Sequence, residues 1–476
     1  MAPFFANQSC DPWQPKSRPC TLGNYVHYTV NVSRAEDIVA AVKFAQAKNI
    51  RFVIRNTGHD YLGKSTGAGA LSVWTHYLKD IEFLDWSDKY YNGKAVMVGA
   101  GVQAYEILAA STAKGLVTVG GECATVGIAG GYTQGGGHSA LSSNFGLSAD
   151  NVLSWEVVTA DGSIVIASRS KNADLYWALS GGGGGTYGVV VSMTVKAHQD
   201  TTVGGASLLF LSSGTTLDNF YSAIDKFHAL LPAMVDAGSM LVYYFTNTSF
   251  EIFPITVYNK SATETQAILS SFMDALPALN ISYTSSFTTS TTYQEHYNTY
   301  FGPLPYGNIK VGIAQYGDRL ISRDNVANNL PALSMAYRNI TENGATFIGV
   351  GLNVSSSTIT SSVSNSVLPA WRNALVHSLL TLPWNFTAPW DDMIALQDEI
   401  TYSVVPQLEA ATPNSGAYLN EGNSRQIGWK QDFYGVNYGK LLSIKNKYDP
   451  NHMFYAVTAI GSDIWTVGAD GRMCRA

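Results

Sequence analysis

The chain has 476 residues, only 13% of them charged, and 29 basic against 35 acidic side chains leave a net charge of −6. A mildly acidic chain without blocks of lysine or arginine is not expected to bind nucleic acid or an anionic membrane surface. No apolar run approaches the ~20 residues needed to cross a bilayer, so no membrane partner is expected. The length predicts two large lobes rather than one simple core.

The first part of the chain predicts a mixed α+β unit with many short strands. A strand over 26–32 precedes a capping box, Ser33 to Glu36, which opens a helix that ends near Lys48. The other expected strands cover 51–54, 71–74, 96–98, 116–119, 152–159, 164–167 and 189–195, and the other expected helices cover 104–114 and 174–179.

Beyond about Gln199 glycine becomes rarer and serine and threonine become more frequent. Alternating segments over 241–245 and 252–257 predict a broad antiparallel sheet, and amphipathic stretches over 217–231 and 263–276 predict helices that cover one of its faces. The last part of the chain returns to a helix, over 436–447. The middle of the chain is therefore expected to fold differently from its two ends.

Cysteines and sequons bear on the cellular compartment. Cys10 and Cys20 flank a polar, proline-containing loop, so we expect a local disulfide formed in an oxidising compartment, whereas Cys474 has no obvious mate. No signal peptide is present, and Met1 is interpreted as a start placed on a trimmed protein. Eight sequons with so few charges predict a secreted glycoprotein. The sequons begin at Asn7, Asn31, Asn247, Asn259, Asn280, Asn339, Asn353 and Asn385.

Three motif matches favour other protein classes, but each lacks the context that its chemistry needs. Gly58–Ser65 matches the phosphate-loop pattern GxxxxGK[ST], yet a strand follows where that motif requires a helix. Gly63–Gly67 matches the GxSxG of serine hydrolases without a strand–turn–helix context. Gly183–Gly188 matches GxGxxG, but it follows a helix and precedes a strand, the reverse of the dinucleotide fingerprint. With no HExxH and no CxxC pair, no metal site is expected.

The glycine-rich segment Gly120–Gly137 is costly to order, because glycine loses the most backbone entropy on folding. Such a segment usually marks a close approach of backbone to a ligand, and its amides can hold a diphosphate as an anion nest. A tight loop without a ligand is the alternative. Gly181–Gly185 is a second segment of this kind. A large, flat cofactor with an anionic tail, such as FAD, would use both.

Four motifs, in order along almost the whole chain, resemble the signatures of one enzyme family. Arg55–Tyr61 resembles the R-x-x-G-H-x-[YF] signature of the FAD-linked oxidases of the vanillyl-alcohol oxidase superfamily. Gly121–Gly127, Asp174–Gly188 and Tyr434–Phe454 resemble further signatures of its berberine-bridge-enzyme-like branch. Tyr418–Gly422 is similar to fungal secreted members related to isoamyl alcohol oxidase.

The resemblance implies an α+β fold. A two-lobed FAD-binding domain of the vanillyl-alcohol oxidase type would combine residues 1–197 and 425–476, and residues 198–424 would form a substrate-binding domain with an antiparallel sheet covered by helices. It also implies an FAD-dependent oxidase that takes hydride from an alcohol, sugar or secondary metabolite at flavin N5 and reduces dioxygen to hydrogen peroxide. We expect a monomer whose partners are its small-molecule substrate and dioxygen.

The resemblance further implies that FAD is bound covalently, through His59 to the flavin 8α-methyl and through Cys123 to C6. Alone, either residue would be ordinary, a loop histidine and a small core thiol. Tyr132 and His138 depart from what many relatives carry. The predicted cofactor-binding residues are His59, Cys123, Arg55, Asn56, Thr57, Gly58, Asp60, Tyr61, Gly121, Thr125, Val126, Gly127, Gly130, Gly131, Tyr132, Gly135, Gly136, Gly137, His138, Gly188, Val189 and Asn420.

The catalytic base is predicted near the start of the C-terminal segment. Glu421 stands where many relatives carry a tyrosine, and we expect burial beside the flavin to raise its pKa towards the working pH. Tyr418 or Tyr434 is the alternative base. A structural ion pair with Arg425 is the alternative role for Glu421.

The resemblance also places Val126 at a position that acts as an oxygen gate, where a small side chain suits an oxidase. The substrate pocket cannot be aligned, and Tyr243, Tyr244 and Phe253 are candidates either for its wall or for ordinary packing. Two other functional classes stay open. One is a cyclase of secondary metabolism without net oxidase turnover, and the other is a binding protein that keeps the flavin fold without catalysis.

Overall fold

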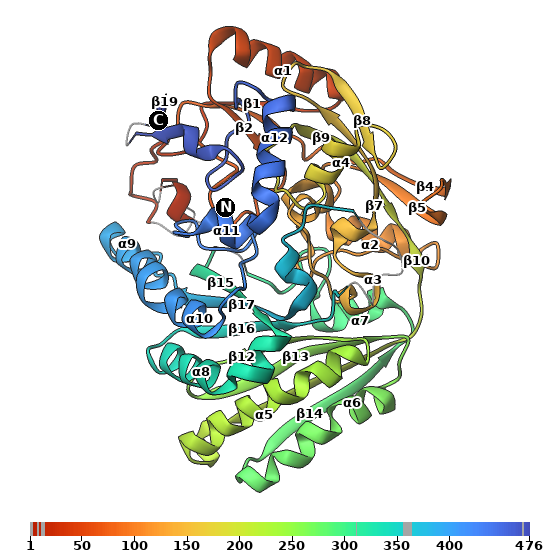
Figure 1. Cartoon of the computed structure of the whole chain (residues 1–476), viewed down its shortest axis with the longest axis vertical. Coiled ribbons are helices and arrows are strands. Elements are labelled where there is room, and N and C mark those ends of the chain that lie inside the picture. Colours follow the sequence, from red (N-terminus) through yellow and green to blue (C-terminus); the bar gives the residue numbers. More distant parts are fainter. Residues whose placement is uncertain (1–2, 7–8, 11–14, 311, 356–363, 469–470) are drawn as a thin grey trace.

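The computed structural model describes residues 3–6, 9–10, 15–310, 312–355, 364–468 and 471–476. The beginning and the end of the chain lie together in the upper lobe of Figure 1, and the middle third forms the lower lobe. This is the α+β arrangement expected from the sequence. The boundaries at 197/198 and 424/425 stay predictions, and the short strand β10 (His198–Gln199) pairs with β6 (Leu116–Val117) of the upper lobe.

Two sheets of three and five strands form most of the upper lobe among the described residues, beside two short two-stranded pairs. In the smaller one β3 lies between β1 and β2 and is parallel to both, and in the larger one the order β4-β5-β9-β7-β8 is antiparallel throughout. The strands are β1 (Tyr28–Asn31), β2 (Phe52–Arg55), β3 (Leu71–Trp74), β4 (Ile81–Ser87), β5 (Asn92–Gly99), β7 (Val152–Val158), β8 (Ile164–Ser168) and β9 (Val189–Lys196). The helices here are α2 (Ala104–Thr112), α3 (Ser142–Phe145) and α4 (Ala173–Leu179).

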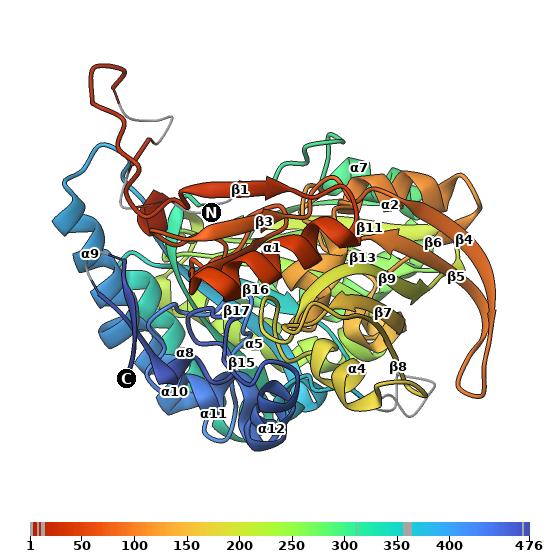
Figure 2. The same cartoon turned by 90° about the horizontal axis from the view of Figure 1, so that it is seen from above.

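Helix α1 (Ala35–Lys48) crosses the small sheet, as Figure 2 shows from above. Its predicted apolar face is confirmed, because Ile38, Ala41, Val42 and Ala45 are buried. The N-terminal cap differs from the prediction. The backbone N–H groups of Ser33 and Arg34 donate to the carboxylate of Asp37, and not to that of Glu36. Asp37 is better placed because the helix begins one residue later than the pattern suggested.

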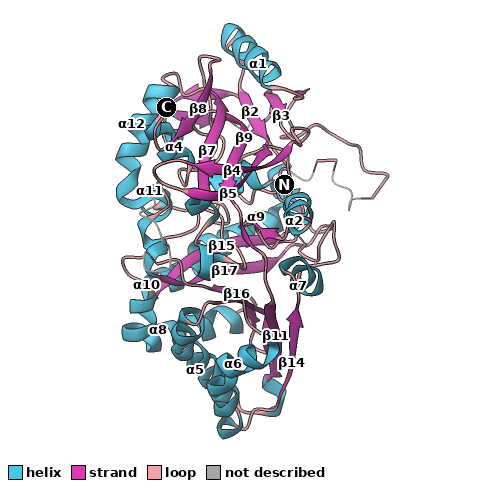
Figure 3. Cartoon of the chain, turned by 90° about the vertical axis from the view of Figure 1, so that its right-hand side faces the viewer, coloured by secondary structure: helices cyan, strands magenta, loops and turns pink. Residues whose placement is uncertain are grey.

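The lower lobe is a seven-stranded antiparallel sheet with the order β14-β11-β13-β12-β16-β17-β15 among the described residues. One face is covered by α5, α6, α8 and α10 (Figures 1 and 3), and the other faces the upper lobe. The strands are β11 (Val203–Leu211), β12 (Ser239–Phe245), β13 (Ser249–Tyr258), β14 (Tyr283–Ser290), β15 (Ala314–Ser322), β16 (Thr346–Gly351) and β17 (Ala374–Pro383). The helices are α5 (Leu217–Asp236), α6 (Ala262–Ala275), α7 (Tyr293–Tyr300), α8 (Arg323–Glu342), α9 (Trp390–Glu399) and α10 (Val405–Ala411).

The C-terminal segment is fastened to the upper lobe. Helix α12 (Tyr438–Tyr448) follows α11 (Trp429–Tyr434) and packs against α4. The buried ammonium group of Lys445 pairs with Asp449 at 2.7 Å and donates to the carbonyl groups of Thr186 and Phe454. All the ammonium hydrogens therefore have acceptors, as a buried cation requires. The C-terminal signature motif thus holds together the two parts of the chain that the resemblance assigned to one domain. The chain ends in a two-stranded ribbon, β18 (Trp465–Val467) with β19 (Met473–Arg475).

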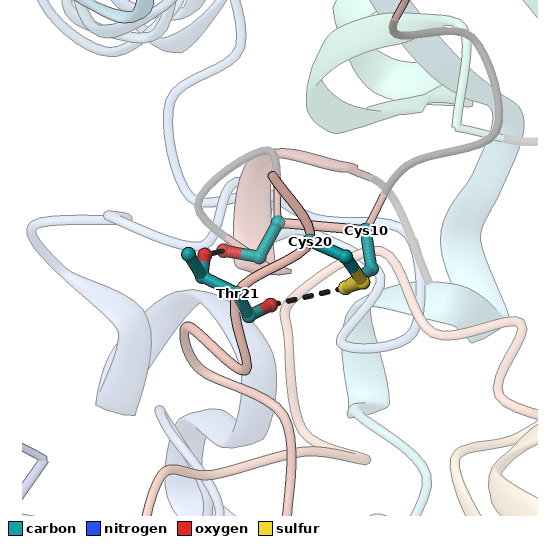
Figure 4. The surroundings of a disulfide bond; sticks show 4 residues. Cys10, Cys20 and Thr21 are labelled. Atoms are coloured by element: carbon teal, nitrogen blue, oxygen red, sulfur yellow. Dashed lines mark hydrogen bonds between the residues drawn. A yellow bond between two sulfur atoms is a disulfide. The ribbon is translucent and has the colours of Figure 1, made fainter. Parts of the chain in front are cut away.

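The predicted disulfide between Cys10 and Cys20 is present, and Figure 4 shows it beside the backbone of Thr21. Cys474 is exposed and has no disulfide partner. In the described parts of the chain, no helix combines the length and the apolar character that crossing a membrane requires.

The sequons differ in how well they could carry a glycan. Asn7 lies outside the described residues, and Asn247 is half-buried. The sequon at Asn353 is poorly placed for a glycan, contrary to the prediction, because the side chain is buried and its amide donates to Asp236 at 2.8 Å. A glycan on this nitrogen could not be accommodated without displacing the buried side chain. The exposed sequon asparagines are Asn31, Asn259, Asn280, Asn339 and Asn385.

Candidate active site

A cavity of about 680 Å³ lies between the two lobes. The upper lobe contributes the loop after β2, the glycine-rich segment around Cys123 and the second glycine run near Gly185. The lower lobe contributes the face of its sheet that the helices leave uncovered, together with the loop after α7. The cavity extends from the glycine-rich loops to the lower sheet, which is the geometry needed for a long cofactor that meets a substrate at one end.

His59 and Cys123 meet at the side chain of Thr125. The hydroxyl oxygen of Thr125 lies 2.8 Å from Nε2 of His59 and 3.7 Å from Sγ of Cys123, and Nδ1 of His59 lies 2.8 Å from the hydroxyl of Thr57. Both His59 and Cys123 line the cavity. Two nucleophiles from loops far apart in sequence are therefore held at one place in the cavity wall.

The imidazole of His59 is kept neutral. Burial lowers its pKa to about 4, with a smaller contribution from nearby positive charge. A neutral imidazole keeps the lone pair that a nucleophile needs, so the environment of His59 suits bond formation to an electrophilic carbon. The threonine hydroxyls on both ring nitrogens fix the orientation of the ring.

The glycine residues leave the cavity wall bare where a flat cofactor would lie against it. A Cβ atom on Gly131 or on Gly185 would meet no atom within 4 Å, although both residues line the cavity. Gly127 is packed instead against Asn56, whose Oδ1 atom would lie 1.8 Å from an added Cβ. That Oδ1 atom is buried and accepts no hydrogen bond from the protein. The bare glycines and this unpaired acceptor fit FAD.

The loop after His59 does not form a phosphate-binding turn. The carboxylate of Asp60 accepts hydrogen bonds from the backbone of Lys64, at 2.6 Å, and from the hydroxyl of Ser65, and no helix follows before β3. Lys64 lines the cavity and reaches the carbonyl of Leu419 at 3.4 Å, and its burial lowers its pKa to about 8. The rejection of the phosphate-loop interpretation is confirmed.

Glu421 lies in a buried cluster that the sequence did not indicate. One oxygen of its carboxylate is 3.2 Å from Nε2 of His138, whose Nδ1 is 3.4 Å from the carboxylate of Glu122. Its other oxygen is 3.8 Å from Nδ1 of His377, on β17. Arg425 pairs with Asp398 at 2.6 Å, so the structural alternative for Glu421 is wrong.

The expected direction of the Glu421 pKa is also wrong. Burial raises the pKa, but the charge of His138 and its hydrogen bond, together with His377, lower it below its ordinary value. For His138 burial acts in the opposite direction, and the carboxylates of Glu122 and Glu421 raise its pKa well above the usual range. The cluster therefore holds an ionised carboxylate and a protonated imidazole side by side in the cavity wall.

His138, His377 and Glu421 place nitrogen and oxygen atoms within 4.8 Å of one another, as the ligands of a cation would be. A protonated His138 cannot bind a metal ion, so the expectation of no metal site stays a prediction. The sequence signals for these partners were weak. Glu122 stands beside Cys123 inside the recognised motif, and His377 is a single histidine in the apolar strand β17. Neither spacing indicates that they approach the same carboxylate.

The two tyrosine alternatives differ. The hydroxyl oxygen of Tyr418 lines the cavity and accepts hydrogen bonds from the backbone of Gly137, at 3.0 Å, and from the side chain of Asn420, at 2.7 Å. Burial raises its pKa far above neutrality. Tyr434 is buried outside the cavity lining and donates to the carbonyl of Thr458 at 3.0 Å. Tyr434 is therefore not placed to act as a base, which corrects that alternative.

The cavity gathers most of the predicted cofactor-binding residues, while the others support it from behind. Those that line it are Asn56, Thr57, Gly58, His59, Asp60, Tyr61, Gly121, Cys123, Val126, Gly127, Gly130, Gly131, Tyr132, His138, Gly188 and Asn420. Those outside the lining are Arg55, Thr125, Gly135, Gly136, Gly137 and Val189. Lining residues that the sequence did not indicate include Lys64, Glu122 and Tyr316, whereas Gly184 and Gly185 belong to the second glycine segment that was expected to hold FAD.

Comparisons with known proteins agree with this site. The family described as "FAD binding domain" matches residues 26–168, and the family "Berberine and berberine like" matches residues 417–461. FAD-linked oxidoreductase ZEB1 of Gibberella zeae is 54% identical over 475 residues, 100% of this chain and 83% of the relative. Bifunctional decalin synthase calF of Penicillium decumbens is 42% identical over 480 residues, 100% of this chain and 83% of the relative.

The crystal structure of the VAO-type flavoprotein MtVAO615 from Myceliophthora thermophila superimposes on this chain with a TM-score of 0.96. It is 44% identical, and the match covers 99% of this chain and 86% of that one. The shared fold, the two matching families and the cavity fitted to FAD lead to one conclusion. The chain belongs to the berberine-bridge-enzyme-like branch of the vanillyl-alcohol oxidase superfamily and is an FAD-linked oxidoreductase.

Proposed function

We propose that the protein is an oxidase whose FAD is bonded to both His59 and Cys123, and that it oxidises a small organic substrate with dioxygen. The observation that carries this proposal is the meeting of the two nucleophiles at Thr125, on the wall of a cavity that fits FAD. When bound, FAD supplies a hydride acceptor that dioxygen can reoxidise. For an alcohol, the substrate would lose a hydride from carbon and a proton from oxygen, and dioxygen would leave as hydrogen peroxide.

In this proposal Glu421 takes the proton from the substrate hydroxyl. Its carboxylate lines the cavity and is ionised, because His138 opposes the effect of burial on its pKa. A carboxylate that is ionised at neutral pH can accept a proton without prior activation. His138, held between two carboxylates, would position Glu421 and keep its charge stable in the buried cluster.

Val126 lines the same cavity close to Cys123, and we propose that its small side chain leaves a path for dioxygen. Its backbone N–H donates to the carbonyl of Cys123 at 3.2 Å. This bond holds Val126 next to the residue that we propose is bonded to FAD. A larger side chain at this point would narrow the approach to the cavity from the glycine-rich loop.

A cyclase without net oxidation is the second candidate, because one relative at 42% identity carries the name decalin synthase. The two functions differ in their electron balance. An oxidase consumes one dioxygen and forms one hydrogen peroxide for each substrate that loses two hydrogen atoms. A cyclase or other isomerase leaves the mass of the product unchanged and consumes no dioxygen.

The test is a simultaneous measurement of dioxygen consumed, peroxide formed and product mass on a panel of alcohols and sugars. Equal molar amounts of dioxygen consumed, hydrogen peroxide formed and product formed, with a product lighter than the substrate by two hydrogens, would support the oxidase. A product with the same mass as the substrate, formed without hydrogen peroxide, would support the cyclase instead of the oxidase. Glu421→Gln should slow flavin reduction by about 10²–10⁴-fold, the usual contribution of a general base, and an unchanged rate would remove Glu421 from this role.

We also propose that the protein is a secreted, glycosylated monomer. The disulfide and the exposed sequons support this, although Asn353 is excluded as a glycan site. Enzymatic removal of N-glycans should lower the mass of protein recovered from culture medium, and light scattering should give the mass of one chain. Recovery only from cell lysate, without glycans, would contradict the proposal.

A further inference from the structure

The lower sheet presents an apolar face to the cavity. In a strand successive side chains point to opposite faces. On β12 the side chains of Val242 and Tyr244 line the cavity, whereas Leu241 and Tyr243 belong to the core beneath the helices. The sequence suggested all the aromatic candidates equally, and this alternation separates Tyr244, in the wall, from Tyr243, in the core.

The same alternation continues across the sheet. On β16 Ile348 and Val350 line the cavity, and on β17 Leu379 and Thr381 do so. Val242 pairs with Val350, Tyr244 with Ile348, and Ile348 with Leu379, so these side chains form a continuous surface. The sheet's complete contribution to the lining is Val242, Tyr244, Phe253, Ala314, Tyr316, Ile348, Val350, Leu379 and Thr381.

This surface offers few hydrogen-bonding groups. Among the described lining residues of the sheet, none is Asp, Glu, Asn, Gln, Arg or Lys, and the polar atoms are the hydroxyls of Thr381, Tyr244 and Tyr316. The ring of Tyr316 stacks on that of Tyr61, with centroids 4.5 Å apart, which adds a second flat apolar surface. The loop after α7 adds Asn308 and Lys310, together with Phe301, Ile309 and Ile313.

The polar groups of the cavity are concentrated elsewhere. Glu421, His138 and Glu122 form the charged cluster between the glycine-rich loops and His377 of β17. A molecule in the cavity would therefore meet a carboxylate at one place and an apolar, partly aromatic wall along the sheet, while Lys64, Asn308 and Lys310 supply further polar groups from the loops. That distribution fits a ligand with one polar reacting group and an apolar body.

Building on the proposed oxidase, we propose that the substrate is an apolar, ring-bearing alcohol whose single hydroxyl reaches Glu421, and not a sugar. A sugar carries several hydroxyl groups that must exchange water for protein partners, and each hydroxyl left unpaired against this wall weakens binding. An apolar ring instead gains from leaving water and stacking beside Tyr61 and Tyr316. The wall therefore selects against carbohydrates.

The test uses the holoenzyme, with 2-naphthylmethanol and cellobiose as probes in anaerobic flavin reduction. The non-oxidisable ketone 2-acetylnaphthalene is titrated by calorimetry as a readout of binding alone. Leu379→Gln places a polar group in the wall, and Val350→Thr adds a hydroxyl with almost no change of volume. Ile166→Gln, at an exposed position on β8, is the matched control for added polarity.

We expect the ketone to bind and the naphthyl alcohol to reduce the flavin, while cellobiose does neither. Leu379→Gln and Val350→Thr should each weaken ketone binding by about tenfold, equivalent to one polar mismatch, and circular dichroism should show that both variants are folded. The control should bind as the parent does.

Binding or oxidation of cellobiose without binding of the ketone would overturn the substrate class and leave the oxidase intact. Failure of both 2-acetylnaphthalene and cellobiose to bind would also overturn the proposed substrate class. Binding of the ketone without flavin reduction by the alcohol would support the apolar pocket and count against the oxidase, so the two failures are distinguishable.

Discussion

Replacing His138 by glutamine should move the pH dependence of flavin reduction. The carboxylate of Glu421 has its pKa lowered by His138 at 3.2 Å, against the opposing effect of burial. Glutamine retains a hydrogen-bond donor but removes the positive charge. Burial then acts with only His377 still opposing it, and the pKa of Glu421 rises.

The magnitude follows from the distance. Two unit charges 3.2 Å apart attract by about 5 kcal/mol at an effective dielectric constant of about 20, which is an upper limit. Opposite charges at such distances shift carboxyl pKa values by about 1–3 units in proteins. A base acts only when deprotonated, so the rate falls as the pH falls through its pKa. Raising that pKa moves the acid limb to higher pH, by about 1–3 units.

The assay is anaerobic stopped-flow measurement of flavin reduction by 2-naphthylmethanol across the pH range, on enzyme with its full flavin content. Arg425→Gln is the matched control, because it removes a cation close to Glu421 in sequence that pairs with Asp398 instead. The control should leave the acid limb in place. An unmoved limb in His138→Gln, with flavin content intact, would refute the electrostatic role of His138.

Three further changes have defined outcomes. Val126→Leu should lower the rate constant of flavin reoxidation by dioxygen about tenfold, which corresponds to about 1.4 kcal/mol of activation free energy. An unaffected rate constant would contradict the proposed path for dioxygen. Gly131→Val should yield folded protein without bound FAD, since the added side chain enters the cavity. The control Gly214→Ala should retain FAD. A valine variant with its full content of FAD would contradict the cofactor's placement. Arg372→Met should lower the free energy of unfolding by denaturant by about 3–5 kcal/mol, because the fully buried Asp150 loses its cation and keeps only hydrogen bonds from Asn365 and Leu147. An unchanged midpoint would count against that pair.

Many of the residues that line the cavity could be predicted because their signals are local. His59 and Cys123 each stand in a short motif with glycines around it, and the structure brings both to one cavity. Strand and helix positions followed from periodicity in the same way, as for β3 and α5. Thr125, which joins the two nucleophiles, was named within its motif, but no pattern showed that its hydroxyl lies between them.

The charged cluster could not be predicted, because its contacts are not local. His138 and Glu421 are 283 positions apart, His138 in the glycine-rich part of the chain and Glu421 in the segment between α10 and α11. His377 reaches them from β17, which lies between β16 and β15 only after the sheet is assembled. The pKa of Glu421 was predicted in the wrong direction for this reason. Its burial could be inferred from the motif, whereas the histidine charges that outweigh burial depend on the tertiary fold.

The most direct test of covalent FAD is acid precipitation of the purified protein and of its His59→Ala, Cys123→Ala and double variants, with visible spectra of pellet and supernatant. We expect the yellow colour to stay in the pellet for the parent and for each single variant, because one bond is enough to hold the cofactor, and to be released only by the double variant. Colour in the supernatant of the parent would contradict the bonds through His59 and Cys123.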